Sequence, residues 1–216
     1  MAQPLLGVLM LQTRFPRLPG DVGHAASFAM PVRHRVVEGA TPQRIVQASD
    51  PALLPPFVDA GRALAGEGAA ALTTSCGFLV RWQAALQAAL PVPVWTSALL
   101  ALPALDRPGV LTVDAASLGA VELAAAGAPA DTPVEGLAED STLRRTLLDD
   151  LPTLDAARAE AEVVEAAERL LRRHAGVRTI VFECTNLPPW ADAVMRATGR
   201  PVHHLMTLVH ERWGHR

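Results

Sequence analysis

The feature of this sequence that most limits its possible folds is an alternation of short apolar segments with longer segments of helical spacing. Residues 5–11 form a continuous apolar run, which is typical of a strand buried on both faces. Residues 69–72 and 109–113 are similar short segments, and each is followed by polar or small residues and then by a helical pattern. Strands that alternate with helices in this way form parallel βαβ units. The sequence therefore predicts an α/β fold.

The predicted elements follow one another along the whole chain. Strands are expected at residues 5–11, 29–37, 69–72, 92–95, 109–113, 178–183 and 202–205. Helices are expected at residues 50–65, 78–90, 97–105, 118–126, 140–151, 155–174, 188–198 and 207–213. Asp50 and Pro51 mark one helix start, because Asp is a good N-cap and Pro fits the first helical position. Residues 128–136 are Pro-rich and give no clear prediction.

The helix at residues 155–174 has the clearest pattern. Its apolar residues recur on one face, and Gly176 follows as a C-terminal cap. Glu165 and Arg169, and likewise Glu168 and Arg172, are spaced i,i+4, which predicts ion pairs on the exposed face.

Composition excludes several functional classes. Half of the 216 residues are hydrophobic, which is enough for a packed core, and the net charge is −3. No basic excess exists that could follow a phosphate backbone, so we expect no nucleic-acid partner. All 19 basic residues are Arg. Without Lys, the chain can form neither the Schiff base of a pyridoxal-phosphate enzyme nor the phosphate loop of the Walker type. Without Tyr, no phenol can act as an acid or a base.

The lengths of the apolar segments bear on the cellular compartment of the protein and on its contact with membranes. None reaches the roughly 18 to 20 residues that span a bilayer. The first residues, from Met1 to Leu11, carry no basic leader. We therefore expect a cytoplasmic protein with no membrane partner and with free thiols.

The cysteines stand out by their surroundings. Cys76 and Cys184 each lie in a turn of small and polar residues between a predicted strand and a predicted helix. Backbone N–H groups at a helix start favour a thiolate, so we expect a lowered thiol pKa. Two thiols that face each other across a cleft can remove a proton from one face of a carbon and return one to the other. The alternative is that each Cys is a small buried hydrophobic residue.

Two segments resemble the active-site segments of the aspartate/glutamate racemase superfamily. They are Thr73-Thr74-Ser75-Cys76-Gly77-Phe78 and Glu183-Cys184-Thr185-Asn186-Leu187-Pro188-Pro189. The resemblance implies two pseudo-symmetric lobes, each with a mainly parallel sheet, and a site between them. It implies one lobe at residues 1–96, completed by a C-terminal helix at 206–216, and a second lobe at 97–205. It also implies a cofactor-independent isomerase that inverts the carbon next to a carboxylate, and a possible homodimer.

The sequence also departs from glutamate racemases within these segments. Those enzymes carry Asp-Ser-Gly after the first strand, where this chain has Met10, Leu11 and Gln12. They carry His two places after the second Cys, where this chain has Asn186. Arylmalonate decarboxylases, hydantoin racemases and maleate isomerases belong to the same superfamily. A decarboxylase, a cis–trans isomerase that works through a Cys adduct, and a non-catalytic protein that binds small acids therefore stay open as alternatives.

The predicted site assigns chemistry to named residues. Cys76 and Cys184 are the expected acid/base pair. Hydroxyl, amide and backbone groups near them, and an Arg in the first loop, are expected to bind a substrate carboxylate. The expected substrate-binding residues are Gln12, Thr13, Arg14, Thr74, Ser75, Gly77, Thr185 and Asn186, with Arg17 and Asp21 as weaker candidates.

We expect no metal and no cofactor. His210 and His215 resemble a zinc-protease helix, but they are five residues apart and would not share a helix face. The expected partner is a small carboxylate-bearing substrate.

Overall fold

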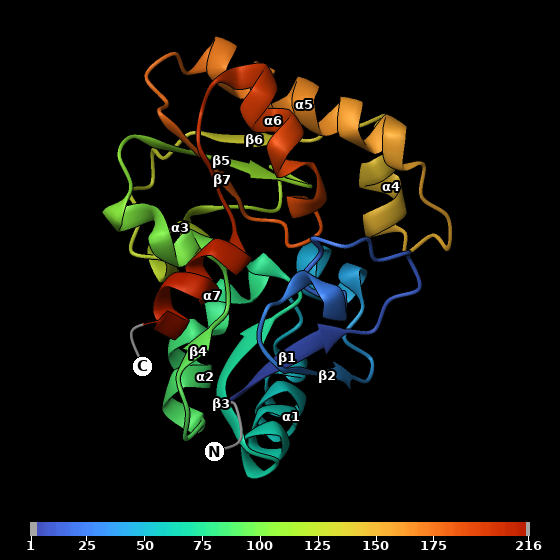
Figure 1. Ribbon diagram of the computed structural model, residues 1–216, viewed down its shortest axis with the longest axis vertical. Coiled ribbons are helices and arrows are strands. Elements are labelled where there is room, and N and C mark those ends of the chain that lie inside the picture. Colours follow the sequence, from blue (N-terminus) through green and yellow to red (C-terminus); the bar gives the residue numbers. More distant parts are fainter. Residues whose placement is uncertain (1–3, 215–216) are drawn as a thin grey trace.

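The computed structural model describes residues 4–214 and contains two sheets of four parallel strands (Figure 1). The first sheet has the order β2-β1-β3-β4 and the second has the order β6-β5-β7-β8. The strands are β1 (Leu5–Leu11), β2 (Val32–Val37), β3 (Ala69–Thr74), β4 (Val94–Trp95), β5 (Pro108–Thr112), β6 (Val134–Gly136), β7 (Thr179–Phe182) and β8 (Val202–His203). Since both sheets have the same strand order, the chain repeats one topology in two lobes. The predicted α/β fold with two lobes is confirmed.

The central strands are apolar because both of their faces are covered. Leu6, Val8 and Leu9 of β1 are fully buried, as are Ile180 and Val181 of β7. A parallel sheet packed between helices requires such continuous apolar runs. The prediction from residues 5–11 holds for this reason, and β1 has these bounds.

Helices cover the faces of the sheets. In the first lobe α1 (Leu54–Gly66) packs against β1, β2 and β3, and in the second lobe α5 (Ala156–Arg173) packs against β5, β6 and α6. The other α-helices are α2 (Gln83–Ala89), α3 (Ala120–Ala125), α4 (Thr142–Leu148), α6 (Ala191–Thr198) and α7 (Leu205–Gly214). Shorter helical turns are η1 (Ala25–Ser27), η2 (Gln43–Gln47), η3 (Pro51–Leu53), η4 (Gly77–Trp82), η5 (Ala98–Ala104) and η6 (Pro188–Trp190).

Helix α5 confirms its sequence pattern. The Asp155 side chain caps its N-terminus by accepting the N–H of Arg158, and one face of the helix is buried. Glu165 and Arg169 form the predicted i,i+4 ion pair at 3.5 Å, and Glu168 and Arg172 form the other at 3.6 Å.

The last helix lies beside the end of the first sheet. Trp213 of α7 packs edge-on against Trp95 of β4, with ring centroids 6.4 Å apart. The predicted lobe boundaries include residues 1–3 and 215–216, which lie outside the described residues, as does His215 of the discounted zinc pattern.

Three elements were not predicted, namely strand β6 and the turns η1 and η2. Strand β6 has three residues at the end of the Pro-rich stretch 128–136, so it has no periodicity of its own. Val110 and Val134 pair across β5 and β6, which shows that contact with β5 defines this strand. The turn η2 buries Ile45 and Val46, and these two apolar residues are too few to form a periodic pattern that would predict it.

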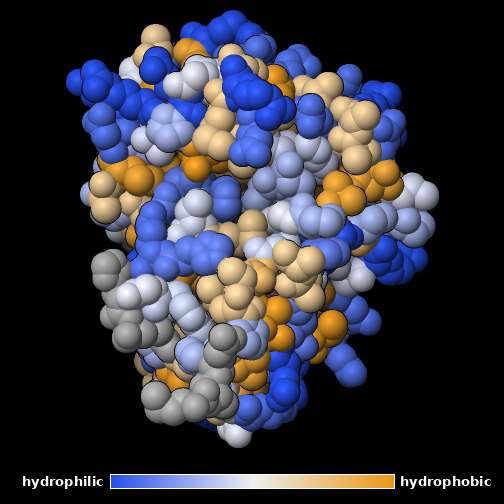
Figure 2. All heavy atoms as spheres, in the orientation of Figure 1, coloured by the Kyte–Doolittle hydropathy of each residue, from blue (hydrophilic) through white to orange (hydrophobic). Residues whose placement is uncertain are grey.

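The surface is mixed in character. Figure 2 shows hydrophobic side chains in small groups among hydrophilic ones on the visible face. Within residues 4–214, no helix combines the length and the apolar character needed to cross a bilayer.

Candidate active site

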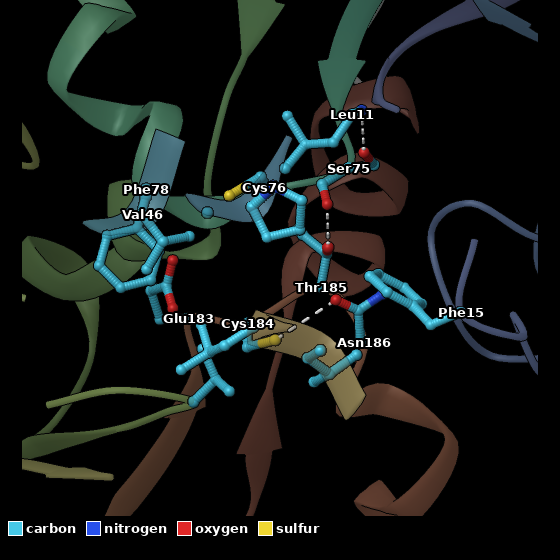
Figure 3. A pocket seen from close by; sticks show the side chains of 15 residues that line it. Leu11, Phe15, Val46, Ser75, Cys76, Phe78, Glu183, Cys184, Thr185 and Asn186 are labelled. Carbon is cyan, nitrogen blue, oxygen red and sulfur yellow. Dashed lines mark hydrogen bonds between the residues drawn. The ribbon is translucent and has the colours of Figure 1, made fainter. Parts of the chain in front are cut away.

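A small cavity lies between the lobes, where the central strands of both sheets end (Figure 3). It leaves about 30 Å³ of free space for water-sized molecules. Carboxyl ends of parallel strands are the usual place for ligands in α/β proteins. The lining residues are mostly apolar: Leu11, Phe15, Pro42, Val46, Ser75, Cys76, Gly77, Phe78, Val113, Leu147, Leu148, Glu183, Cys184, Thr185 and Asn186.

Cys76 enters the cavity from the turn after β3. The backbone of Ser75 donates to Leu9 O at 2.9 Å, which continues the pairing of β3 with β1. The Thr74 hydroxyl donates to Cys76 O at 3.0 Å and so shapes the turn. Burial and the nearby Glu183 carboxylate raise the pKa of the Cys76 thiol to about 12, although the Phe78 N–H, Arg81 and Arg17 act in the opposite direction.

Cys184 enters from the corresponding turn after β7. Its thiol lies 3.6 Å from Asn186 Oδ1, which accepts a hydrogen bond from it. Burial raises the pKa of this thiol well above its usual value, and the charges of Glu183 and Asp21 act in the same direction. The expected lowering of both thiol pKa values is therefore wrong, because desolvation outweighs the effect of the helix start.

A buried network fixes Asn186. Its Nδ2 donates to Asp21 Oδ2 at 2.6 Å, and Asp21 also pairs with Arg17 at 2.9 Å. Arg17 in turn donates to the Thr13 hydroxyl at 3.0 Å and lies over the Phe15 ring at 4.8 Å. Asn186 thus presents its oxygen, not its nitrogen, to Cys184.

Several buried contacts join the lobes around the cavity. The Thr185 hydroxyl donates to Ser75 O at 2.6 Å and links the two cysteine turns directly. Arg81 of η4 pairs with Glu122 of α3 at 2.6 Å, where the Glu122 side chain is buried and the Arg81 side chain is 11% exposed. The two thiols are therefore held in one rigid frame.

Glu183 is a site residue that the sequence did not single out. It is fully buried, and its Oε2 accepts a hydrogen bond from the Thr112 hydroxyl at 2.6 Å. Its Oε1 has no hydrogen-bond partner within residues 4–214. Burial raises the pKa of Glu183 to about 8, and the charge of Glu122 acts in the same direction. A single charged residue at the end of an apolar strand does not by itself predict a site residue. The sequence feature that indicates Glu183 is its position directly before Cys184.

The structure brings together six of the predicted site residues. These are Ser75, Cys76, Gly77, Cys184, Thr185 and Asn186, all in the cavity lining.

The other predicted binding residues lie outside the lining. Arg14 is exposed and pairs with Asp150 at 3.2 Å, so its guanidinium is engaged elsewhere. Gln12 accepts the Gly39 N–H, and Thr13 accepts from Arg17. Thr74 donates its hydroxyl to Thr96 O as well as to Cys76 O, which makes it a support for the turn. The position of the first loop in the chain predicts that its side chains bind substrate, but it does not reveal these hydrogen-bond partners.

The described residues were also compared with the side-chain groups that bind metal ions. Within the described residues, no group of three His, Cys, Asp or Glu side chains is arranged to hold an ion.

Comparison with curated proteins finds lyases. The chain is 32% identical over 213 residues to the dimethylsulfoniopropionate lyase of Durusdinium sp. clade D. That alignment covers 92% of this chain and 70% of the lyase. It is also 32% identical over 226 residues to dimethylsulfoniopropionate lyase 6 of Emiliania huxleyi (strain CCMP1516), covering 94% of this chain. This chain spans 57% of the length of that second relative. No protein-family model matches the chain.

Comparison with solved structures finds the same fold. A Gly74Cys mutant of arylmalonate decarboxylase aligns over 92% of this chain and 87% of its own, with a TM-score of 0.63 and 17% identity. An aspartate racemase homologue from Pyrococcus horikoshii OT3 aligns over 97% of this chain and 98% of its own, with a TM-score of 0.54 and 14% identity. These likenesses agree with the two-lobe architecture inferred from the sequence.

Proposed function

Because the chain belongs to the family of the dimethylsulfoniopropionate lyase of Durusdinium sp. clade D, within the aspartate/glutamate racemase superfamily, we propose that it is a carbon–sulfur lyase that acts on dimethylsulfoniopropionate. The observation that carries the proposal is the 32% identity to that lyase over 92% of this chain, in a fold where a free thiol of each lobe lines one apolar cavity. Such a cavity suits removal of a proton from a carbon next to a carboxylate.

The proposed reaction is a β-elimination. A thiolate removes a proton from the carbon next to the substrate carboxylate, and the electron pair of that C–H bond forms the new C=C bond. The bond from the β carbon to sulfur breaks, and dimethyl sulfide leaves with its electron pair. Acrylate remains, and the proton on the thiol returns to solvent. The sulfonium is already a good leaving group, so the departure of the sulfide requires no acid.

Cys76 is the base in this proposal. Burial makes both thiols hard to ionise, but their neighbours differ. Arg81 and Arg17 favour a Cys76 thiolate. Asp21 disfavours a Cys184 thiolate, and Asn186 Oδ1 accepts a hydrogen bond from the thiol form of Cys184. Cys184 therefore stays a neutral thiol in this proposal, with its proton donated in a hydrogen bond to Asn186 Oδ1. The positive charge of the substrate supplies the counter-charge that Cys76 lacks.

Donors near the turns would hold the carboxylate. The Ser75 hydroxyl accepts the Leu11 N–H at 2.9 Å, which leaves its own proton to donate. As negative charge moves onto the carboxylate during proton removal, such donors stabilise the transition state more than the bound substrate.

A racemase is the second candidate, and the presence of both thiols favours it. Racemisation begins with the same removal of an α proton but needs a second acid to return a proton to the opposite face. Elimination needs only one base. The two activities therefore predict different effects of losing each cysteine.

The test is turnover of dimethylsulfoniopropionate by the purified chain. Dimethyl sulfide is measured in the headspace by gas chromatography, and acrylate is measured by proton NMR. We expect Cys76→Ser to lower kcat/KM by about 10³-fold and Cys184→Ser to lower it by about 10- to 100-fold. Circular dichroism of each variant checks that the fold is kept.

The same NMR samples, prepared in D₂O, separate the alternatives. A panel of amino acids, hydantoins and substituted malonates is followed in parallel. Exchange with inversion on an amino acid that requires both thiols would identify a racemase, and release of CO₂ from a malonate would identify a decarboxylase. Absence of dimethyl sulfide from a folded, active-site-intact chain would overturn the lyase proposal.

A further inference from the structure

The Glu183 carboxylate is the charged group of the cavity lining. It lies directly before Cys184, and Figure 3 shows it on one side of that cysteine with Asn186 on the other. The Thr112 hydroxyl donates to Oε2, and Oε1 is buried without a hydrogen-bond partner among the described residues. A buried carboxylate oxygen left unpaired costs free energy, so it requires an explanation.

Close packing holds this carboxylate against the cysteine turn. A Cβ atom at Gly77 would lie 2.4 Å from Glu183 Oε1 and 2.1 Å from Glu183 O. Both distances are far shorter than real contacts, so only glycine leaves room for Glu183 here. The carboxylate is therefore fixed at the wall of the cavity.

Among residues 4–214, no basic side chain lines the cavity to neutralise it. Arg81 is near enough to influence Glu183, but its Nη2 is engaged by Glu122 at 2.6 Å. Both cysteine thiols also feel the Glu183 charge. The cavity is thus lined by an acidic group and two thiols, with apolar walls that include Phe15 and Phe78.

We propose that Glu183 determines specificity by binding the positively charged end of a zwitterionic substrate through its unpaired Oε1. The substrate class is an onium group, sulfonium or quaternary ammonium, separated from a carboxylate by two carbons. Aromatic rings such as Phe78 also attract onium groups. The inference rests on the proposed function for the identity of that substrate, but its test measures binding and is independent of turnover.

The test compares two ligands of the same shape that differ in charge. These are 3-(trimethylammonio)propanoate, which is zwitterionic, and 4,4-dimethylpentanoate, which replaces the ammonium nitrogen with carbon. Calorimetry at pH 8.5 should give at least about tenfold tighter binding of the zwitterion by the wild-type chain. In Glu183→Gln the preference should fall to about threefold or less. Glu135→Gln is the control, because Glu135 is buried and ion-paired with Arg169 outside the cavity, and it should keep the full preference.

A second measurement uses the wild-type chain and does not depend on how the variant folds. With the pKa of Glu183 raised to about 8, a bound cation should drive the carboxyl to ionise. Zwitterion binding near pH 7.5 should therefore release a proton and should strengthen as the pH rises through 8. Arg81, Glu122, Cys76 and Cys184 are the other charged or titratable groups near Glu183. Proton release should persist in Cys76→Ser and disappear in Glu183→Gln.

The outcomes separate this inference from the proposed function. Equal binding of the two ligands by the wild-type chain, or an unchanged preference in Glu183→Gln, would overturn the role of Glu183 even if dimethylsulfoniopropionate is cleaved. A Glu183-dependent preference without cleavage would support this inference and overturn the lyase proposal.

Discussion

At the scale of single residues, Gly77 controls the spacing between the two cysteine turns. We expect Gly77→Ala to lower the free energy of unfolding by about 1–3 kcal/mol and to lower activity, because its Cβ would collide with the backbone oxygen of Glu183. Urea unfolding and turnover measure the two effects. Gly66→Ala is the control, since a Cβ there meets nothing within 4 Å and should be neutral or slightly stabilising. Wild-type stability and activity in Gly77→Ala would contradict this close packing.

Residue by residue, the sequence indicated the cysteines but not their electrostatic surroundings. Small polar turns after apolar strands identified Cys76 and Cys184, because that pattern depends on neighbouring residues only. Arg14 lies outside the cavity lining and pairs with Asp150, a partner that is distant in the sequence. The raised thiol pKa values depend on burial from both lobes, which a linear pattern does not reveal.

At the scale of elements, one carboxylate organises the start of α4. Glu162 of α5 accepts the backbone N–H groups of Thr142 and Leu143 and the hydroxyls of Ser141 and Thr142. Burial alone would raise the pKa of Glu162, but these donors lower it to about 2. Helix α4 in turn supplies Leu147 and Leu148 to the cavity wall.

We expect Glu162→Ala to lower the free energy of unfolding by about 2–3 kcal/mol, because several donors lose a charged acceptor. Urea unfolding measures this loss, and Glu160→Ala, at an exposed position on the same helix, should change stability by no more than about 0.5 kcal/mol. The pKa of Glu162 is depressed on folding, so its contribution is complete above about pH 4.5 and is lost as the pH falls towards 2. Equal effects of the two variants would contradict the capping role.

Elements with an internal pattern were predictable, and elements defined by contact were not. Helix α5 has a periodic apolar face and a capping Asp155, so its position followed from local residues. Strand β6 lies at the end of a Pro-rich stretch, and it is defined by its pairing with β5, which is distant in the sequence. The sequence therefore predicted three of the four strands in the second sheet.

At the scale of the whole molecule, a buried ion pair joins the lobes. Arg81 comes from the first lobe and Glu122 from the second. We expect Glu122→Gln to cost about 3–5 kcal/mol of unfolding free energy, because it leaves a buried guanidinium without its counter-charge. The double variant Arg81→Met, Glu122→Met should cost less than Glu122→Gln alone, since no unpaired charge remains. Urea unfolding of both variants tests this, and a double variant at least as unstable as the single one would refute it.

The raised pKa values of the thiols also have a consequence for the lifetime of the proposed enzyme. Acrylate, the expected product, is an electrophile that alkylates thiolates by conjugate addition, and thiols react far more slowly. When the product forms, the base has just received a proton and is a neutral thiol. Burial and Glu183 then keep both thiols protonated. The same surroundings that make Cys76 a reluctant base would protect the enzyme from inactivation by its own product.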